Sequence, residues 1–169
     1  KIAGGNIIAF IDADCIPDDN WLLMLHKSIN QKEKFIIAGS VKSIGGETIW
    51  DTRLDSVNSP KYLPNTGTLN MIFKKEIIEE VGFFDENLEC GEDIDFCWRA
   101  TDKGYKIEYK KDVVVYHDWA NFKQEMRRAF WYGKARVKLY KKHPHRYKNL
   151  LGYDIITLAY PLFIVALPL

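Results

Sequence analysis

An uninterrupted apolar segment near the start of the chain stops at a pair of aspartates. Residues 7–11 read Ile-Ile-Ala-Phe-Ile, and Asp12 and Asp14 follow at once. A short apolar run of β-branched and aromatic residues is typical of a buried strand, and the polar residues 17–20 indicate a loop that leads into a helix. The chain must therefore fold so that two carboxylates stand at the end of a core strand.

Strand-like and helix-like segments alternate along the rest of the chain. We expect further strands at 35–41, 69–73, 105–109 and 112–116, and helices at 18–30, 75–81, 92–103 and 121–142. In the first helix, we expect one buried face made of Trp21, Leu22, Leu25 and Ile29. The alternation indicates an α/β fold with a mixed, mostly parallel sheet, in which ligands bind beyond the carboxyl ends of the strands.

Composition places the chain among globular proteins. It has 169 residues, of which 47% are hydrophobic and 28% charged, enough for one domain with a core. It begins at Lys1 and ends inside an apolar run, so we expect it to be a piece of a longer polypeptide. Three cysteines without metal-site spacing favour buried, reduced thiols.

The positive charge is concentrated in one stretch. Residues 123–148 contain ten Lys or Arg and one acidic residue, whereas the whole chain has a net charge of +1. Residues 155–169, which follow this stretch, carry no charge. A basic segment before an apolar one is typical of a protein at the cytoplasmic face of a membrane, and the alternative is a buried terminal helix. We expect a basic interfacial helix over 119–150 and an apolar, membrane-inserting segment over 151–169.

The aspartate pair has the chemistry of a cation site. Residues two apart on an extended chain point the same way, so Asp12 and Asp14 can face one Mg²⁺ or Mn²⁺ ion that also holds phosphates. A second acidic step, Glu92-Asp93, opens a predicted helix, where carboxylates either cap backbone N–H groups or accept a proton from a hydroxyl nucleophile. In the same helix, Asp95 and Arg99 can form an exposed structural ion pair.

Four segments, taken together, resemble a known family. They read GGNIIAFIDADCIPDDNWL, NTGTLNMIFKKEIIEEVGFFDENL, CGEDIDFCWRATDKGYKIEY and VVVYHD. Their order and spacing are similar to family 2 glycosyltransferases of the GT-A fold, a Rossmann-like α/β architecture. The resemblance implies an inverting transfer of a sugar from a nucleotide-diphosphate sugar to a hydroxyl acceptor.

The resemblance also implies roles for individual residues. Asp14 would bind the divalent cation that bridges the donor diphosphate, Asp12 would contact the ribose or the hydrated ion, and His117 would approach the metal. Asp93 would be the general base that deprotonates the acceptor, and Glu92 its partner. The acceptor would be bordered by residues 43–67, with Thr66 and Gly67 at the site.

Residues 124–131 are similar to the Q-x-x-R-W element of membrane-bound polysaccharide synthases. The element lies beside the diphosphate and the acceptor in those enzymes, so Arg127 and Arg128 would hold phosphate and Trp131 would contact the acceptor. The match is imperfect, because Arg128 stands where the family has Trp, and this departure argues against processive polymerisation. The alternative for these basic residues is a helix that lies on anionic lipid.

The expected organisation is therefore the acceptor- and metal-binding part of a GT-A domain over 1–118, without the nucleotide-binding part that precedes it in the family. The expected partners are a nucleotide sugar, with UDP as its nucleotide, a glycan or lipid acceptor and the membrane, without nucleic acid. Two other classes of protein are alternatives. One is a phosphotransferase or nuclease in which Asp12, Asp14, Glu92 and Asp93 surround two metal ions, and the other is a non-catalytic membrane scaffold.

Overall fold

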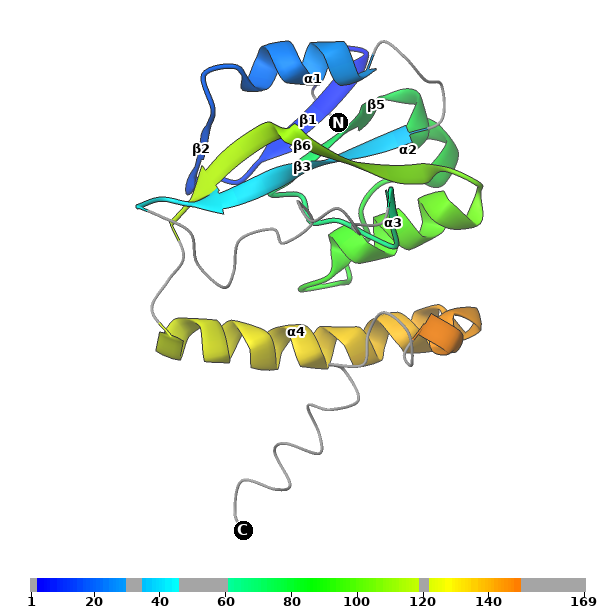
Figure 1. The fold of residues 1–169 in the computed structure, drawn as a ribbon. Helices are drawn as coiled ribbons and strands as arrows, with labels where there is room; N and C mark the ends of the chain where they lie inside the picture. The colour runs from blue at the N-terminus through cyan, green and yellow to red at the C-terminus, as the bar shows by residue number, and fades with distance from the viewer. Residues whose placement is uncertain (1–2, 30–34, 46–60, 119–121, 150–169) are drawn as a thin grey trace. The chain divides into compact units, whose positions relative to one another are not determined.

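The computed structural model describes residues 3–29, 35–45, 61–118 and 122–149 (Figure 1). Two compact units divide the chain. Unit 1 contains Lys1–Asp85 and Asp93–Trp119, and unit 2 contains Glu86–Glu92 and Ala120–Leu169. Each unit is described by itself below.

A mixed β-sheet forms the centre of unit 1. Its strands are β1 (Ile7–Ile11), β2 (Cys15–Pro17), β3 (Phe35–Ser43), β4 (Tyr62–Leu63), β5 (Asn70–Lys74) and β6 (Lys106–His117). The order across the sheet is β1-β5-β3-β6-β2, and β4 pairs with β6 beside this path. The α/β architecture with parallel and antiparallel strands agrees with the expectation from the sequence.

The expectation of a mostly parallel sheet was wrong. Among the described strands only β3 and β6 run parallel, whereas β1–β5, β3–β5, β2–β6 and β4–β6 are antiparallel. An apolar strand reads the same in either direction when helices cover both faces of the sheet, so its composition does not fix its orientation. β5 therefore runs opposite to both of its neighbours.

Two other strand predictions need correction. The residues expected to form strands 105–109 and 112–116 form one strand, β6, with an irregularity in its pairing where Gly39 and Ser40 of β3 face Lys110 and Val114. β1 is half-exposed rather than buried, because within the described residues it pairs with β5 alone and lies at the end of the strand order.

Helices cover both faces of the sheet (Figure 1). α1 (Trp21–Ile29) packs Leu25 against Ile37 and Ile72 on one face. α2 (Glu76–Val81) and α3 (Glu92–Asp102) bury apolar side chains on the other face. The members of this second cluster include Ile77, Val81, Phe96, Cys97, Ala100, Met71, Phe73 and Ile107.

The predicted core face of α1 was partly wrong. Leu22 is 69% exposed, and Met24 packs on the core with Trp21 and Ile29 instead. Just before the helix, the carboxylate of Asp18 accepts a hydrogen bond from the N–H of Asn20, at 3.0 Å. By residue type Asp18, Asp19 and Asn20 are all candidates for a cap at this helix start.

The side chain of Asn70 fills the irregularity between β3 and β6. Its Nδ2 donates to the carbonyl oxygens of Ser40 and Val113, each at 2.9 Å, and its Oδ1 accepts from Trp21 Nε1 at 3.1 Å. Asn70 is buried, so these bonds satisfy backbone groups that the irregular pairing leaves without a strand partner. One amide thus ties β3, β6 and α1 together.

Gly39 is required beside this amide. A Cβ atom at Gly39 would overlap the side chain of Asn70 and lie 2.5 Å from the carbonyl oxygen of Val113. We expect Gly39→Ala to lower the free energy of unfolding by about 3 kcal/mol, since it overpacks the core and displaces a buried hydrogen-bonded group. Urea denaturation measures this change. Gly4→Ala is the matched control, because no atom lies within 4 Å of the added methyl group, and an equal loss in both variants would contradict the prediction.

Asp95 and Arg99 pair as predicted, but the pair is not exposed. Arg99 Nε lies 2.8 Å from Asp95 Oδ2, and the Asp95 side chain is fully buried. The guanidinium also donates to the carbonyl oxygens of Val81, Gly82 and Phe83, which close α2. The pair is buried because it satisfies the end of another helix, a contact that spacing within α3 cannot reveal.

Unit 2 contains the basic helix α4 (Phe122–Lys142) and the short 3₁₀ helix η2 (Pro144–Asn149). Gly91, at φ +83°, packs against α4: a Cβ there would lie 2.9 Å from Leu139 Cδ1. Within the described ranges, no helix combines the length and the apolar character needed to cross a bilayer. The predicted apolar segment 151–169 lies outside the described residues.

Candidate functional site

Asp14 of the first acidic motif lies next to His117 in unit 1, and Asp93 of the second motif also belongs to unit 1. After β1, the N–H of Cys15 donates to the carbonyl oxygen of Asp12 at 3.0 Å, which turns the chain sharply. β2 starts at Cys15 and pairs with the end of β6, so that Cys15 stands opposite His117. Strand pairing therefore brings the aspartate motif to a histidine far along the sequence.

Asp14 and His117 are the part of this cluster that suits a cation. His117 Nε2 lies 3.4 Å from Asp14 Oδ2; the imidazole is buried and the carboxylate is 55% exposed. Two ligands of one octahedral ion, each at about 2.1 Å, stand about 3 Å apart, so the pair fits a shared ion. Carboxylate oxygens suit Mg²⁺ and Mn²⁺, and imidazole nitrogen is a common ligand of divalent metal ions.

Cys15 and Asp12 relate differently to this pair. Cys15 offers a sulfur within 4.8 Å of the Asp14 and His117 ligand atoms, but hard cations prefer oxygen and nitrogen. Burial raises the pKa of the Cys15 thiol to about 11, and the charges of Asp14 and Asp12 add to the rise. The carboxylate of Asp12 is exposed and does not belong to the cluster, so its predicted role in metal or ribose binding stays a prediction.

Asp93 stands in the first turn of α3, beside the segment expected to meet the acceptor. Its Oδ1 accepts a hydrogen bond from the N–H of Ile94 at 2.7 Å, and a Cβ at Gly67 would lie 3.4 Å from its Oδ2. One helical turn later, Cys97 Sγ donates to the carbonyl oxygen of Thr66 at 3.5 Å. The structure thus places Thr66 and Gly67 near the predicted base, Asp93. One oxygen of the Asp93 carboxylate accepts a backbone hydrogen bond at the start of α3.

A pocket of about 300 Å³ opens beside Thr66 and Gly67. Its lining residues are Ala38, Gly39, Val41, Leu63, Asn65, Thr66, Gly67, Leu69, Asn70 and Tyr109. The sequence motifs predicted that the stretch from Asn65 to Gly67 borders the acceptor. The motifs did not predict Tyr109 or Asn70 as site residues. For Asn70 the only sequence signal was an amide at the start of an apolar strand, and for Tyr109 there was no signal.

Strand β3 connects the pocket to the Asp14–His117 pair. Val41 lines the pocket, and Ser43, two residues further along β3, stands opposite His117 in β6. A strand advances by about 3.3 Å per residue, so these two positions on β3 are roughly 7 Å apart. His117 therefore pairs with β3 two residues beyond Val41, which lines the pocket.

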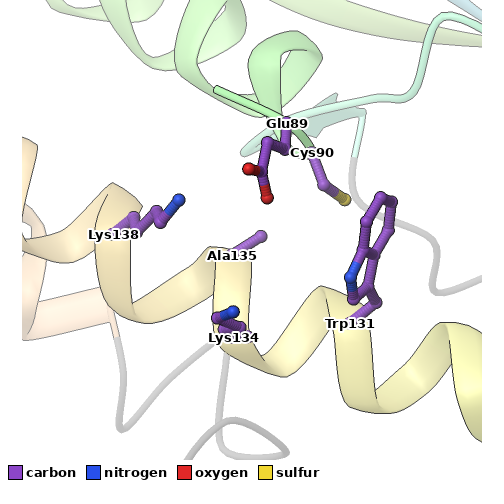
Figure 2. A pocket seen from close by; sticks show the side chains of 6 residues that line it. All are labelled: Glu89, Cys90, Trp131, Lys134, Ala135 and Lys138. Atoms are coloured by element: carbon purple, nitrogen blue, oxygen red, sulfur yellow. The ribbon is translucent and has the colours of Figure 1, made fainter. Parts of the chain in front are cut away.

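The predicted residues on α4 belong to unit 2. Arg127 and Trp131 are exposed and Arg128 is half-buried. Figure 2 shows Trp131 with lysines of α4 around a small hollow that also includes Glu89 and Cys90. The hollow has a volume of about 20 Å³, room for a water molecule and not for a substrate. The donor-phosphate and acceptor roles of Arg127, Arg128 and Trp131, and the role of Glu92, stay predictions.

The thiol of Cys97 gives a prediction on stability. Burial raises its pKa to about 12 from 9.0. Between these pH values the folded protein keeps a proton that the unfolded chain has lost, so the free energy of unfolding falls as pH rises, by at most about 1.4 kcal/mol per pH unit. Urea denaturation at pH 8 to 11 measures this slope.

Cys97→Ala is the control for this slope and should flatten it. Two other groups account for a remaining part of the slope. Burial raises the pKa of Cys15 to about 11, and burial, with a hydrogen bond to Glu80, raises the pKa of Tyr105 to about 12. An identical slope in wild type and Cys97→Ala would contradict the assignment.

Comparison with known proteins gives the family. The family model described as "Glycosyl transferase family 2" matches residues 1–100. The chain belongs to glycosyltransferase family 2. This confirms the resemblance carried by the four sequence segments, of which the first two and part of the third lie inside the matched range.

This family member is similar to a longer protein. It is 27% identical over 146 residues to "Glycosyltransferase AglE" of Haloferax volcanii, an alignment that covers 82% of this chain and 48% of that protein. The chain therefore spans about half the length of this curated relative.

Solved structures support the GT-A fold. A mannosyltransferase from Pyrobaculum calidifontis, in complex with GDP-Man and Mn²⁺, matches 93% of this chain and 48% of its own with a TM-score of 0.59 at 19% identity. GalNAc-T7, with UDP, GalNAc and Mn²⁺, matches 70% of this chain and 28% of its own with a TM-score of 0.56 at 18% identity. At these identities the likeness concerns the fold.

Proposed function

We propose that the full-length protein is an inverting glycosyltransferase, which moves a sugar from a nucleotide-diphosphate sugar to the hydroxyl group of a glycan or lipid acceptor. The observation that carries the proposal is the arrangement along β3. It sets the Asp14–His117 pair, 3.4 Å apart, near the pocket whose Gly67 wall meets Asp93. A leaving diphosphate and an incoming alcohol need such neighbouring sites.

The proposed reaction is a single displacement. The acceptor oxygen forms a bond to the anomeric carbon while the bond from that carbon to the diphosphate oxygen breaks, and its electron pair stays with the nucleoside diphosphate. Asp93 takes the proton of the acceptor hydroxyl, and Glu92 assists by contacting the acceptor or the base. Because attack and departure occur on opposite faces of the carbon, the configuration inverts.

Asp14 and His117 would hold the cation, with Asp12 at the ribose or the hydrated ion. A bound Mn²⁺ or Mg²⁺ would supply Lewis-acid stabilisation of the departing diphosphate. In the structurally similar mannosyltransferase and in GalNAc-T7, Mn²⁺ accompanies the nucleotide ligand, which supports a divalent cofactor here. Arg127 and Arg128 are proposed to bind donor phosphate through charged, bidentate hydrogen bonds.

We also propose that the protein works at the cytoplasmic face of a membrane. Support comes from the basic stretch before the apolar residues 155–169 and from α4, which exposes Trp131, Tyr132 and Val137 among lysines. Aromatic and basic side chains on one helix are the composition of an interfacial anchor.

The test is an assay of the full-length protein in membranes against a panel of sugar nucleotides that includes UDP- and GDP-sugars. We expect divalent-cation-dependent release of nucleoside diphosphate together with a glycosylated product, and NMR of the product should show inverted anomeric configuration. Cleavage of phosphodiesters instead of sugar nucleotides would favour the nuclease alternative and contradict the proposal.

A further inference from the structure

Among the residues that the structure describes, those that line the pocket beside Asp93 all have uncharged side chains. None of its ten lining residues is Asp, Glu, Lys, Arg or His, although 28% of the chain is Asp, Glu, Lys or Arg. Its polar groups are amides and hydroxyls, from Asn65, Thr66, Asn70 and Tyr109. The remaining walls are glycine or aliphatic. This composition differs from that of a phosphate or carboxylate site, which requires basic partners.

Asn70 contributes to the pocket as a fixed wall. Its Nδ2 already donates to Ser40 and Val113, and its Oδ1 accepts from Trp21 Nε1. The amide therefore has no remaining proton for a ligand. Polar contacts to an occupant would come from Asn65 and Thr66, and an aromatic surface from Tyr109, on the neighbouring strand β6.

We propose that this pocket binds one uncharged pyranose unit of the acceptor and that Asn65 and Tyr109 determine its specificity. The inference rests on the proposed function, because Asp93 identifies this side of the site as the one that meets the nucleophile. A sugar ring has hydroxyls for the amide and hydroxyl groups and an apolar face for the aromatic ring. The volume of about 300 Å³ is at the lower end of ligand pockets, which suits a single ring.

A charged acceptor unit is excluded by solvation. A carboxylate or phosphate that entered the pocket would lose hydration and find no cation among the lining side chains. The pocket should therefore bind a neutral pyranoside at least about tenfold more tightly than its uronic-acid counterpart.

The experiment measures binding of two probe sets to the full-length protein by NMR titration. One set contains methyl glucoside, mannoside, galactoside and N-acetylglucosaminide, and the other contains methyl glucuronide and galacturonide. We expect at least one neutral probe to bind and the uronides to bind at least about tenfold more weakly. Equal or tighter binding of the uronides, or no binding by any neutral probe, would overturn the proposal.

Matched variants locate the binding. Tyr109→Ala should weaken binding of the neutral probe by about tenfold. Tyr109→Phe, which keeps the ring, should bind the probe within about threefold of the wild-type affinity. Asn65→Asp puts a carboxylate in the pocket and should also weaken binding. Asn87→Asp adds the same charge at an exposed turn and should leave binding unchanged. Wild-type affinity in both Tyr109→Ala and Asn65→Asp would overturn the assignment.

Hydrolysis of the sugar nucleotide separates this inference from the proposed function. Water can replace the acceptor, so the wild-type protein should release nucleoside diphosphate from a sugar nucleotide in a metal-dependent reaction when no acceptor is present. If wild type lacks this release with every sugar nucleotide, the proposed function fails. If the release is normal and the probes fail to bind as described, the pocket assignment alone fails.

Discussion

Replacing Asp93 with Asn should lower the rate of sugar transfer by about 10²–10⁴-fold and leave the fold intact. The amide cannot take the acceptor proton, and general-base catalysis contributes about that factor. The amide oxygen can still accept the hydrogen bond that Asp93 Oδ1 receives from the N–H of Ile94, so α3 should keep its first turn. Formation of the glycosylated acceptor measures the rate, and thermal unfolding measures the stability.

Asp112→Asn is the matched control for this change. Asp112 is exposed on β6, so the same loss of charge there should leave the rate within about twofold of wild type. A scaffold without catalytic function would not distinguish the two variants. More than a tenth of the wild-type rate in Asp93→Asn would contradict the assignment of the base.

Removal of divalent metal should abolish transfer, and added Mn²⁺ should restore it. In the proposed site Asp14 and His117 would hold the cation; Asp14 Oδ2 and His117 Nε2 lie 3.4 Å apart. Asp14→Asn and His117→Ala should each weaken Mn²⁺ binding by at least about tenfold, as measured by EPR titration, and transfer should fall with it.

Asp19→Asn serves as the control for the metal variants. Asp19 is an exposed aspartate of the same acidic stretch, outside the cluster of potential ligands. It should bind Mn²⁺ like wild type. Full transfer after complete chelation, or wild-type Mn²⁺ affinity in Asp14→Asn, would contradict the metal site.

Local chemistry explains the predictions that agree with the structure. The helix expected over 75–81 is followed by Gly82, which has φ +88°, and Asp18 accepts a backbone hydrogen bond just before the first helix. The helix that starts at Glu92 begins where its acidic residues and Gly91 indicate. In each case the residues that decide the structure are neighbours in the sequence, so a single stretch of chain contains the information.

Contacts between distant segments explain the predictions that were wrong. Periodicity alone placed Leu22 on the core face of the first helix. In the structure Met24 packs against the sheet that α1 covers. The Asp95–Arg99 pair was expected to be exposed, and it is buried because Arg99 reaches the carbonyl groups that end α2. Side-chain spacing within one helix carries no information about which surface that helix meets.

The sequence by itself determined the chemistry: the aspartate motif after a core strand, the Glu92-Asp93 step and the family to which their order belongs. Only the tertiary structure decided which of these groups lie close together. It paired Asp14 with His117 through β2 and β6, and it placed Gly67 against Asp93 at a pocket that Tyr109 helps to line. The reason is physical, since residue types and spacing express local preferences, whereas strand pairing and burial depend on partners far away in the chain.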